Sequence, residues 1–314
     1  MKLAFILDPL EELKTEKDSS LAMMREAAAR GHAIYTLDQG DLLLRDAQAV
    51  MQAAPFSFST GNPWYQTGEK QEYAPQQFDA ILMRKDPPFD AEYVVSTWLL
   101  ELAEQQGARV LNRPQSIRDW NEKLSVARFP QFAPPFLVTR QCKAIREFLA
   151  IHGDIVVKPL DGMGGSGVFR LHADDHNIGV ILETITHFGR RTVMAQRYLP
   201  EIKAGDKRIL VINGAPVPYA LARIPKPGET RGNLAAGGTG VAQPLSVRDR
   251  EIAETVGVEL KKHGLFLAGL DVIGDFLTEI NVTSPTCMVE IAAQTPCNPA
   301  KLFVDALEQA CTAS

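Results

Sequence analysis

The sequence predicts a two-part fold, in which a small parallel α/β domain precedes a half built mainly of antiparallel sheet with helices. In the first third, short apolar runs alternate with amphipathic helical segments, as they do around a parallel sheet. From about residue 123 onward, paired strand-like runs flank turn residues, as they do in hairpins. A length of 314 residues, 45% of them hydrophobic, is enough for about two domains with cores of their own.

The first part begins with the apolar run at residues 2–7, which predicts a buried strand. Ser19 or Ser20 is expected to cap the helix that follows, and Gly31 stands where a helix C-terminus favours glycine. The other elements expected here are strands at 33–37, 78–83 and 108–112 and a helix at 91–106.

The second part contains three predicted hairpins. Asn213-Gly214, between two apolar runs, is a strong signal for a type I′ turn. Residues 224–240 follow neither a helical nor a strand period and are rich in Gly and Pro, which indicates a functional lid or a disordered loop. The remaining expected elements are strand pairs at 154–160 with 167–172 and at 267–274 with 276–282, and a closing helix near 302–310.

Composition and charge exclude several function classes. A formal net charge of −5 and a pI of about 5.8 leave no basic excess for nucleic acid or an anionic membrane surface. The apolar start is interrupted by Asp8 and Pro9, so no signal peptide is expected. The four cysteines form no CxxC pair, which argues against zinc or a disulfide framework and fits a cytoplasmic location.

The glycine-rich turn at residues 162–167 satisfies GxGxxG. A dinucleotide-binding turn would open a helix, yet the next residues favour a strand, and the companion motifs of a protein kinase are absent. We therefore expect a hairpin loop whose backbone N–H groups approach phosphate oxygens, with Lys158 on the strand before it. An edge-strand lysine beside an ordinary turn is the alternative.

Glu279 and Asn281 lie two residues apart on one predicted strand and so share a face, an arrangement suited to magnesium. Asp271, on the partner strand, joins them only in the right register. A two-residue loop puts Asp271 opposite Thr278, and a three-residue loop puts it opposite Glu279, so a shared site predicts the longer loop. Solvated residues on the outer face of a hairpin are the alternative.

Taken in chain order, the motifs resemble the ATP-grasp superfamily, and most closely the prokaryotic glutathione synthetases. The resemblance implies an N-terminal pre-ATP-grasp domain over 1–122 and an ATP-grasp domain over 123–314, the latter with a lid lobe at about 123–200 and a catalytic lobe at about 201–314. The segments that carry it are MRKDPPFD, LNRPQSIRDWNEKL, KPLDGMGGSGVFR, GDKRILVINGAPVPYALARIP, ETRGNLAAGG and GLDVIGDFLTEINVTSPTC.

The same resemblance implies roles for individual residues. Phosphate binding falls to Lys123, Lys158, Gly164, Gly165 and Ser166. The adenine is edged by Gln196, Tyr198 and Leu199, and the ribose contacts Asp206. The magnesium ligands are Asp271, Glu279 and Asn281. Residues around the peptide substrate and the reacting carboxyl are Lys17, Asp18, Ser19, Arg84, Arg208, Arg223, Arg231, Asn281 and Ser284, of which Arg208, Arg223 and Arg231 are the catalytic candidates.

The activity that this resemblance implies is ATP-dependent ligation of γ-glutamylcysteine with glycine through an acyl-phosphate, with Mg²⁺ as the cofactor and Mn²⁺ as the alternative. Family analogy adds a cytoplasmic homotetramer with small-molecule partners only. Two other functions stay open, namely another ATP-grasp carboxylate–amine ligase such as a D-alanine–D-alanine ligase, and a nucleotide-binding regulator without turnover. Cys287 is interpreted as a buried reduced thiol, because the implied reaction needs no covalent enzyme intermediate.

Overall fold

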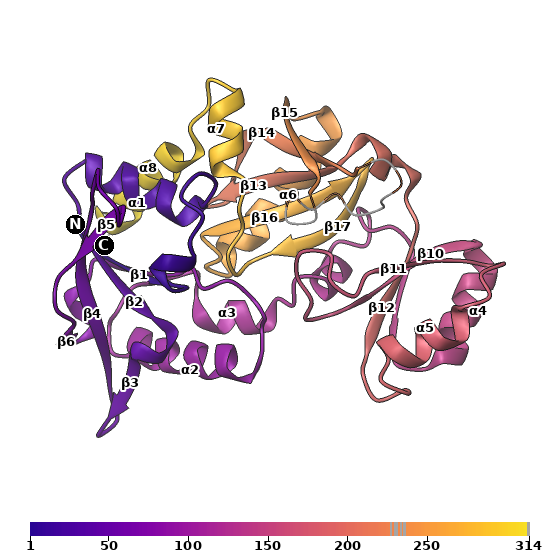
Figure 1. The fold of residues 1–314 in the computed structure, drawn as a ribbon, viewed down its shortest axis with the longest axis horizontal. Coiled ribbons are helices and arrows are strands. Elements are labelled where there is room, and N and C mark those ends of the chain that lie inside the picture. The colour runs from indigo at the N-terminus through magenta and orange to yellow at the C-terminus, as the bar shows by residue number, and fades with distance from the viewer. Residues whose placement is uncertain (227, 229–231, 233, 235–236, 313–314) are drawn as a thin grey trace.

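The computed structural model describes residues 1–226, 228, 232, 234 and 237–312. The described residues form three sheets, one within residues 2–111, one within 136–197 and one within 206–281. In Figure 1 the first sheet lies on the left, the second on the right, and the third between them. This arrangement confirms the predicted fold class. The domain boundary at 122/123 and the lobe boundary near 200 stay predictions.

The N-terminal sheet has the predicted parallel centre. Strand β1 (Lys2–Leu7) pairs in parallel with β2 (Ala33–Asp38) and with β7 (Ala80–Met83), and β7 pairs in parallel with β8 (Val110–Leu111). Beyond β2 the sheet continues as an antiparallel extension that the sequence did not predict. It consists of β3 (Leu42–Arg45), β4 (Gln48–Phe58), β5 (Tyr65–Thr67) and β6 (Gln71–Tyr73).

Helices α1 (Ser19–Ala29) and α2 (Ala91–Gln105) confirm the two helices expected in this part. The predicted cap of α1 was wrong. The carboxylate of Asp18, not a serine hydroxyl, accepts the N–H of Leu21 at 2.9 Å, while Ser19 and Ser20 are buried inside the first turn. Gly31 has a φ of +79° just after the helix, as expected of a glycine at that position.

The second sheet, ordered β11-β10-β12-β9, is antiparallel and is covered by α4 (Cys142–His152) and α5 (Ile178–Ile185). The predicted hairpin around the glycine loop is confirmed as β10 (Asp154–Pro159) and β11 (Phe169–His172). The outer strands are β9 (Phe136–Thr139) and β12 (Val193–Arg197).

The third sheet, ordered β15-β14-β13-β16-β17, is also antiparallel. Asn213 and Gly214 have φ values of +48° and +86° between β13 and β14, as a type I′ turn requires. Helix α6 (Val247–Lys262) packs on one face of this sheet. The strands are β13 (Asp206–Ile212), β14 (Ala215–Ile224), β15 (Thr239–Pro244), β16 (Leu267–Ile273) and β17 (Phe276–Asn281).

After β17 the chain forms α7 (Met288–Gln294) and α8 (Pro299–Thr312), and α8 lies against α1 in the N-terminal part (Figure 1). One continuous core contains Leu3 and Phe5 of β1, Leu210 of β13 and Phe303 of α8. The first and third sheets are therefore joined through shared apolar packing. Among the described helices, none has the length and apolar character needed to span a bilayer.

Candidate active site

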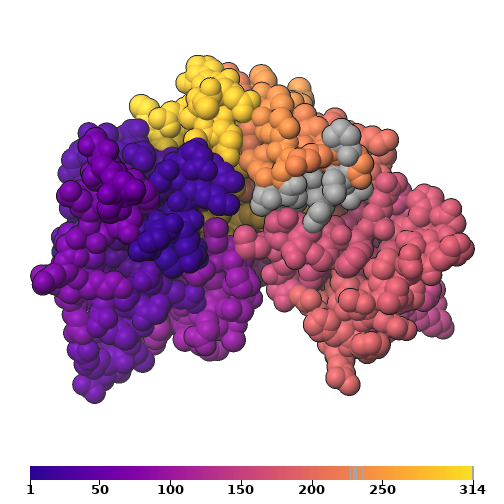
Figure 2. All heavy atoms as spheres, in the orientation of Figure 1, coloured from indigo at the N-terminus to yellow at the C-terminus, as the bar shows by residue number. Residues whose placement is uncertain are grey.

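A cavity of about 600 Å³ lies between the three sheets. Figure 2 shows a recess at the centre of this face, bordered by indigo N-terminal residues and by the pink residues of the second sheet. Most residues that the sequence singled out line this one cavity. They are Lys17, Asp18, Lys123, Lys158, Gly164, Gly165, Ser166, Gln196, Tyr198, Leu199, Asp206, Arg208, Arg223, Asp271, Glu279, Asn281 and Ser284.

Two buried lysines approach the strand that carries Glu279. Lys123 Nζ lies 3.0 Å from Glu279 Oε1 and donates to the carbonyl of Gly162 at 2.6 Å. Lys158 Nζ, on β10, donates to the carbonyl of Thr278 at 3.3 Å. Burial opposes the charged form of both lysines. For Lys123 the neighbouring charge of Glu279 overcomes burial and raises the pKa, whereas burial prevails at Lys158 and lowers its pKa.

The glycine loop closes the cavity on the side of the second sheet. Gly164, Gly165 and Gly167 have φ values of +61°, +79° and +68°, a backbone region that glycine adopts at little cost. Ser166 N–H donates to the carbonyl of Met163 at 3.0 Å, which forms a tight turn. The loop thus exposes small residues and backbone groups toward the cavity, as the sequence predicted.

The hairpin of β16 and β17 brings Asp271 opposite Glu279, as a shared site requires. The structure reaches this pairing in a different way from the predicted three-residue loop. The turn between the paired residues Ile273 and Phe276 has only two residues, and a bulge between Asp271 and Val272 shifts the register by one. The predicted three-residue loop was therefore wrong, although the pairing that it was meant to produce is present.

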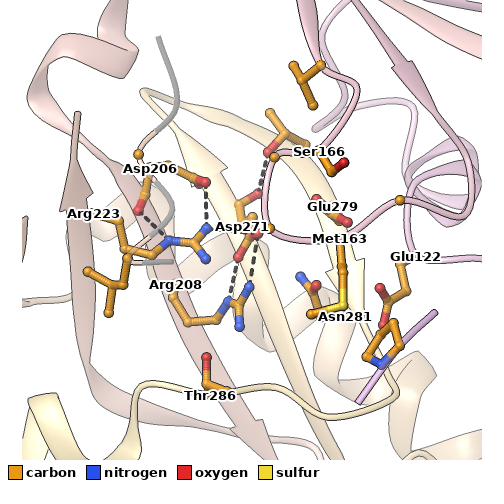
Figure 3. A pocket seen from close by; sticks show the side chains of 18 of the residues that line it. Glu122, Met163, Ser166, Asp206, Arg208, Arg223, Asp271, Glu279, Asn281 and Thr286 are labelled. Atoms are coloured by element: carbon orange, nitrogen blue, oxygen red, sulfur yellow. Dashed lines mark hydrogen bonds and ion pairs between the residues drawn. The ribbon is translucent and has the colours of Figure 1, made fainter. Parts of the chain in front are cut away.

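Asp271 is held by two arginines, as Figure 3 shows. Arg208 donates to both of its carboxylate oxygens, with Nε 2.6 Å from Oδ1 and Nη2 3.1 Å from Oδ2. Arg223 Nη2 lies 2.8 Å from Asp271 Oδ2 and 2.5 Å from Asp206 Oδ2. The four side chains form one alternating network of charges, which fixes the arginines at the cavity wall.

The network sets the protonation of its acids in opposite directions. Burial favours the neutral form of Asp271, but Arg208 and Arg223 together hold its pKa well below the usual range. At Asp206 burial prevails over Arg223, and the negative charge of Asp271 adds to it, so the pKa is raised. Asp271 is thus firmly ionised, whereas Asp206 gains a proton more readily than a free carboxyl.

Two buried polar atoms on the side of the cavity near β12 and β13 have no hydrogen-bond partner among the described residues. They are Gln196 Nε2 and Asp206 Oδ1, and both side chains line the cavity. An unmade hydrogen bond at a buried atom costs about 1–3 kcal/mol, so such atoms point to a ligand that completes them. Next to them, the guanidinium of Arg170 lies 3.6 Å from the ring centroid of Tyr198.

The side-chain oxygens of Glu279 and Asn281, which line the cavity, suit a hard divalent cation. Asn281 Nδ2 donates to the carbonyl of Gly269 at 3.2 Å, so its oxygen, rather than its amide nitrogen, is left for a cation. In the described ranges, no group of three or more His, Cys, Asp or Glu side chains forms a closed metal cage. Magnesium fits this arrangement, because it uses one or two protein ligands and takes the rest from water and substrate phosphates.

Two predicted site residues are placed elsewhere, and a third lies outside the described residues. Within the described part of the chain, Arg84 and Ser19 are buried behind the cavity wall and do not line it. Arg84 donates from Nε to Ser20 Oγ and from Nη2 to the carbonyl of Pro285, both at 2.9 Å. Ser19 Oγ accepts the N–H of Met288 at 3.2 Å. Arg231 lies outside the described residues.

Several cavity residues escaped the sequence analysis. Glu122 Oε1 accepts hydrogen bonds from the N–H groups of Val282 and Thr283, at 3.0 and 3.2 Å. These bonds hold the chain just after β17, the strand that carries Glu279. Its position beside Lys123 was the only sequence signal. Polar lining residues without any local pattern to mark them are Asp8, Asp86, Arg170, Thr286 and Glu290.

Sequence comparison matches the chain to one family over nearly its whole length. The profile described as "Prokaryotic glutathione synthetase, N-terminal domain" matches residues 1–118, and "Prokaryotic glutathione synthetase, ATP-grasp domain" matches residues 122–296. A protein named glutathione synthetase from Nitrosomonas europaea is 64% identical over 98% of both chains. Another of that name, from Ralstonia nicotianae, is 59% identical over 99% of this chain and 96% of its own.

Solved structures agree at the level of the fold. The crystal structure of the D-cycloserine synthetase DcsG covers 99% of this chain and 100% of its own with a TM-score of 0.70 at 15% identity. The D-alanyl-alanine synthetase A of Vibrio cholerae gives a TM-score of 0.62 at 14% identity, over 100% of this chain and 98% of its own. Given these matches and the cavity between its sheets, the chain belongs to the prokaryotic glutathione synthetase family and is an ATP-dependent ligase of the ATP-grasp fold.

Proposed function

We propose that this ligase phosphorylates the cysteinyl carboxylate of γ-glutamylcysteine with ATP and then joins it to glycine, with release of ADP and phosphate. The observation that carries the proposal is that Lys158 and Glu279 face one cavity, with Arg208 and Arg223 beside them. Positive groups for a triphosphate, acidic groups for a cation and arginines for a carboxylate therefore meet in one place.

Phosphate binding falls to Lys123, Lys158 and the backbone of the glycine loop. Lys123 forms an ion pair with Glu279. A bound triphosphate would give the ammonium of Lys123 a second anionic partner. Gln196 and Asp206 carry unpaired atoms that suit an adenine edge and a ribose hydroxyl. Glu279 and Asn281, with Asp271 as the third predicted ligand, would hold magnesium, which would neutralise charge on the phosphates.

Arg208 and Arg223 offset the negative charge that builds up as the phosphoryl group moves to the carboxylate. Both are buried, and Asp271 holds both by charge-assisted bonds, so little reorganisation is needed at the moment of reaction. The substrate carboxylate attacks the γ-phosphorus, and ADP leaves. The neutral amine of glycine then attacks the activated carbonyl, phosphate leaves, and the amine loses a proton to solvent.

Exclusion of water is the remaining requirement, because an acyl-phosphate hydrolyses readily. Residues 224–240 are proposed as the lid and Arg231 as a lid residue that acts when the site is closed; seven residues of this segment, Arg231 among them, lie outside the described residues. Lys17, Asp18 and Ser284 are proposed to contact the peptide, since they line the same cavity.

The test is the release of ADP from purified enzyme with ATP and Mg²⁺. Release that needs both γ-glutamylcysteine and glycine supports the proposal. Release driven equally by D-alanine indicates a ligase of the D-alanine–D-alanine kind, and nucleotide binding without release indicates a regulator. Replacing Mg²⁺ by Mn²⁺ in the same assay shows which metal the enzyme prefers. The homotetramer and the cytoplasmic location stay predictions, the first checked by light scattering.

A further inference from the structure

Two residues of opposite charge line the cavity away from the arginine network. Glu290 lies in the first turn of α7, and Lys17 lies just before α1. Neither belongs to the set of lysines, arginines and acids that surrounds Glu279 and Asp271. Phosphoryl transfer accounts for that set, leaves Glu290 without a role, and does not say which group of the peptide Lys17 contacts.

Glu290 Oε2 is buried and has no hydrogen-bond partner among the described residues. A buried oxygen without a hydrogen bond destabilises the protein by about 1–3 kcal/mol, and by more when the group is ionised. The unpaired oxygen of Glu290 therefore indicates that a ligand supplies the missing donor. The side chain is only partly buried and lines the cavity, so a ligand in the cavity can reach it. The same burial raises the pKa of Glu290, and Lys17 acts against it.

The position of Glu290 along the cavity follows from its neighbours. Cys287 directly precedes α7 and Glu290 lies in the first turn of that helix, and both line the same cavity as Arg208 and Arg223. Lys17 lies near the start of α1, which the hydrogen bond from Met288 N–H to Ser19 Oγ joins to the start of α7. The cavity wall therefore includes the arginine pair, Cys287 and Glu290 as well as Lys17 of the N-terminal part.

Glu290 and Lys17 line the same cavity without forming an ion pair with each other in the described part of the chain. In the described ranges no salt bridge within 4.0 Å joins them, and none engages Lys17 elsewhere. Ser19 Oγ accepts the N–H of Met288 at 3.2 Å, which holds the starts of α1 and α7 together. An unpaired carboxylate and an ammonium that line one cavity suit a zwitterion, which carries an ammonium and a carboxylate on one carbon.

We propose that Glu290 determines donor specificity by accepting the α-ammonium of the γ-glutamyl group, while Lys17 faces the α-carboxylate of the same group. The inference rests on the proposed function, which places the cysteinyl carboxylate at Arg208 and Arg223. The rest of the peptide then extends along the wall toward Glu290. A buried acceptor left unpaired rejects a substrate that lacks the donor, often by orders of magnitude.

The experiment compares γ-glutamylcysteine with glutarylcysteine, which lacks only the α-ammonium. In the unaltered enzyme, kcat/KM for ADP release with glycine is expected to be about 100-fold or more higher for γ-glutamylcysteine. Glu290→Gln is expected to remove most of this difference, because γ-glutamylcysteine loses its anionic partner while glutarylcysteine loses nothing. Glu254→Gln, at an exposed position of α6, is the matched control and is expected to keep the full ratio.

The ratio of the two peptides separates specificity from a structural role, since a distorted site lowers both values together. An unaltered enzyme that uses both peptides equally, or a Glu290→Gln variant that keeps the full ratio, overturns the inference and leaves the proposed function standing. If glycine-dependent turnover is absent altogether, the proposed function fails, and calorimetric binding of the two peptides still decides the inference. Should Glu290→Gln not fold, the ratio measured with Glu290→Ala takes its place, and an unchanged ratio again overturns the inference.

Discussion

Lys123 Nζ lies 3.0 Å from Glu279 Oε1, so the ammonium proposed to bind phosphate and the carboxylate proposed to bind metal are partners in the free enzyme. Both are removed from bulk water to a large extent, with side chains 5% and 21% exposed. A ligand that brings phosphate and cation together satisfies both groups at once. Because Lys123 and Glu279 are paired, a substitution at Glu279 tests both phosphate binding and metal binding.

Glu279→Ala is expected to reduce Mg²⁺-dependent ADP release by at least about 100-fold, because the variant loses the only ionised ligand not already held by arginines. The fold is expected to persist with a lower melting temperature, since Lys123 loses its ion pair. Titration of Mg²⁺ in the turnover assay, with circular dichroism in parallel, provides the measurement. Rates like those of the unaltered enzyme rule out the metal role, and Glu254→Ala serves as the exposed control.

Asp271→Asn is expected to lower the free energy of unfolding at pH 7 by about 3–5 kcal/mol, because two buried guanidinium groups lose their anion. The pKa of Asp271 is depressed in the folded chain. Its stabilising effect is therefore complete above the unfolded pKa of about 4 and is lost as the pH falls through the folded pKa. Urea denaturation at several pH values should show the two proteins converging in acid. A constant gap down to low pH contradicts the argument.

Gly165→Ala is expected to raise KM for ATP about 10-fold, since a left-handed backbone costs an alanine roughly 1–2 kcal/mol and the loop must hold its shape against phosphate. Gly153→Ala is the matched control. Gly153 has a similar φ of +72°, open space around its Cβ position, and a place at the end of α4 rather than in the cavity lining. Steady-state kinetics and melting curves of both variants separate backbone strain from nucleotide binding, and equal KM values for ATP in the two variants contradict a phosphate role for the loop.

Arg84→Lys tests whether Arg84 contacts the peptide or positions the segment that does. The lysine keeps the charge but cannot hold Ser20 and the Pro285 carbonyl together. We expect KM for the donor peptide to rise about 10-fold, which corresponds to a loss of about 1.4 kcal/mol of binding free energy, with little change in KM for ATP.

A double-mutant cycle with Ser20→Ala decides between the two roles of Arg84. If Arg84 acts through its bond to Ser20, the serine variant shows part of the same defect and adds little to Arg84→Lys. If Arg84 binds the peptide directly, Ser20→Ala is silent. In both cases the control measurement is the glycine KM in each single variant.

The sequence was sufficient where local chemistry decides the structure. Asn213-Gly214 has one favourable hairpin geometry, and the glycine loop followed by a strand excludes a dinucleotide turn, so both predictions were confirmed. Register was harder. Spacing alone implied that Asp271 could face Glu279 only across a longer loop, because a bulge has no signature in the residues of this hairpin.

Contacts between distant segments were beyond the reach of sequence patterns. Arg84 lies in a motif shared with the family, yet whether it meets the peptide or the Pro285 carbonyl depends on how two segments 201 residues apart are packed. The same holds for Glu290, whose unpaired oxygen is visible only in three dimensions. The antiparallel extension of the first sheet was missed because its strands alternate little in polarity.

The packing of α8 against α1 bears on how the chain reaches its native state. The apolar core beneath β1 includes Phe303 and Leu307, so β1 finds its complete set of neighbours only after nearly three hundred further residues have been synthesised. Until then, the N-terminal sheet has an uncovered apolar face that a chaperone or another nascent chain can bind. Removal of residues 299–312 would leave the synthesised protein in that same incomplete condition.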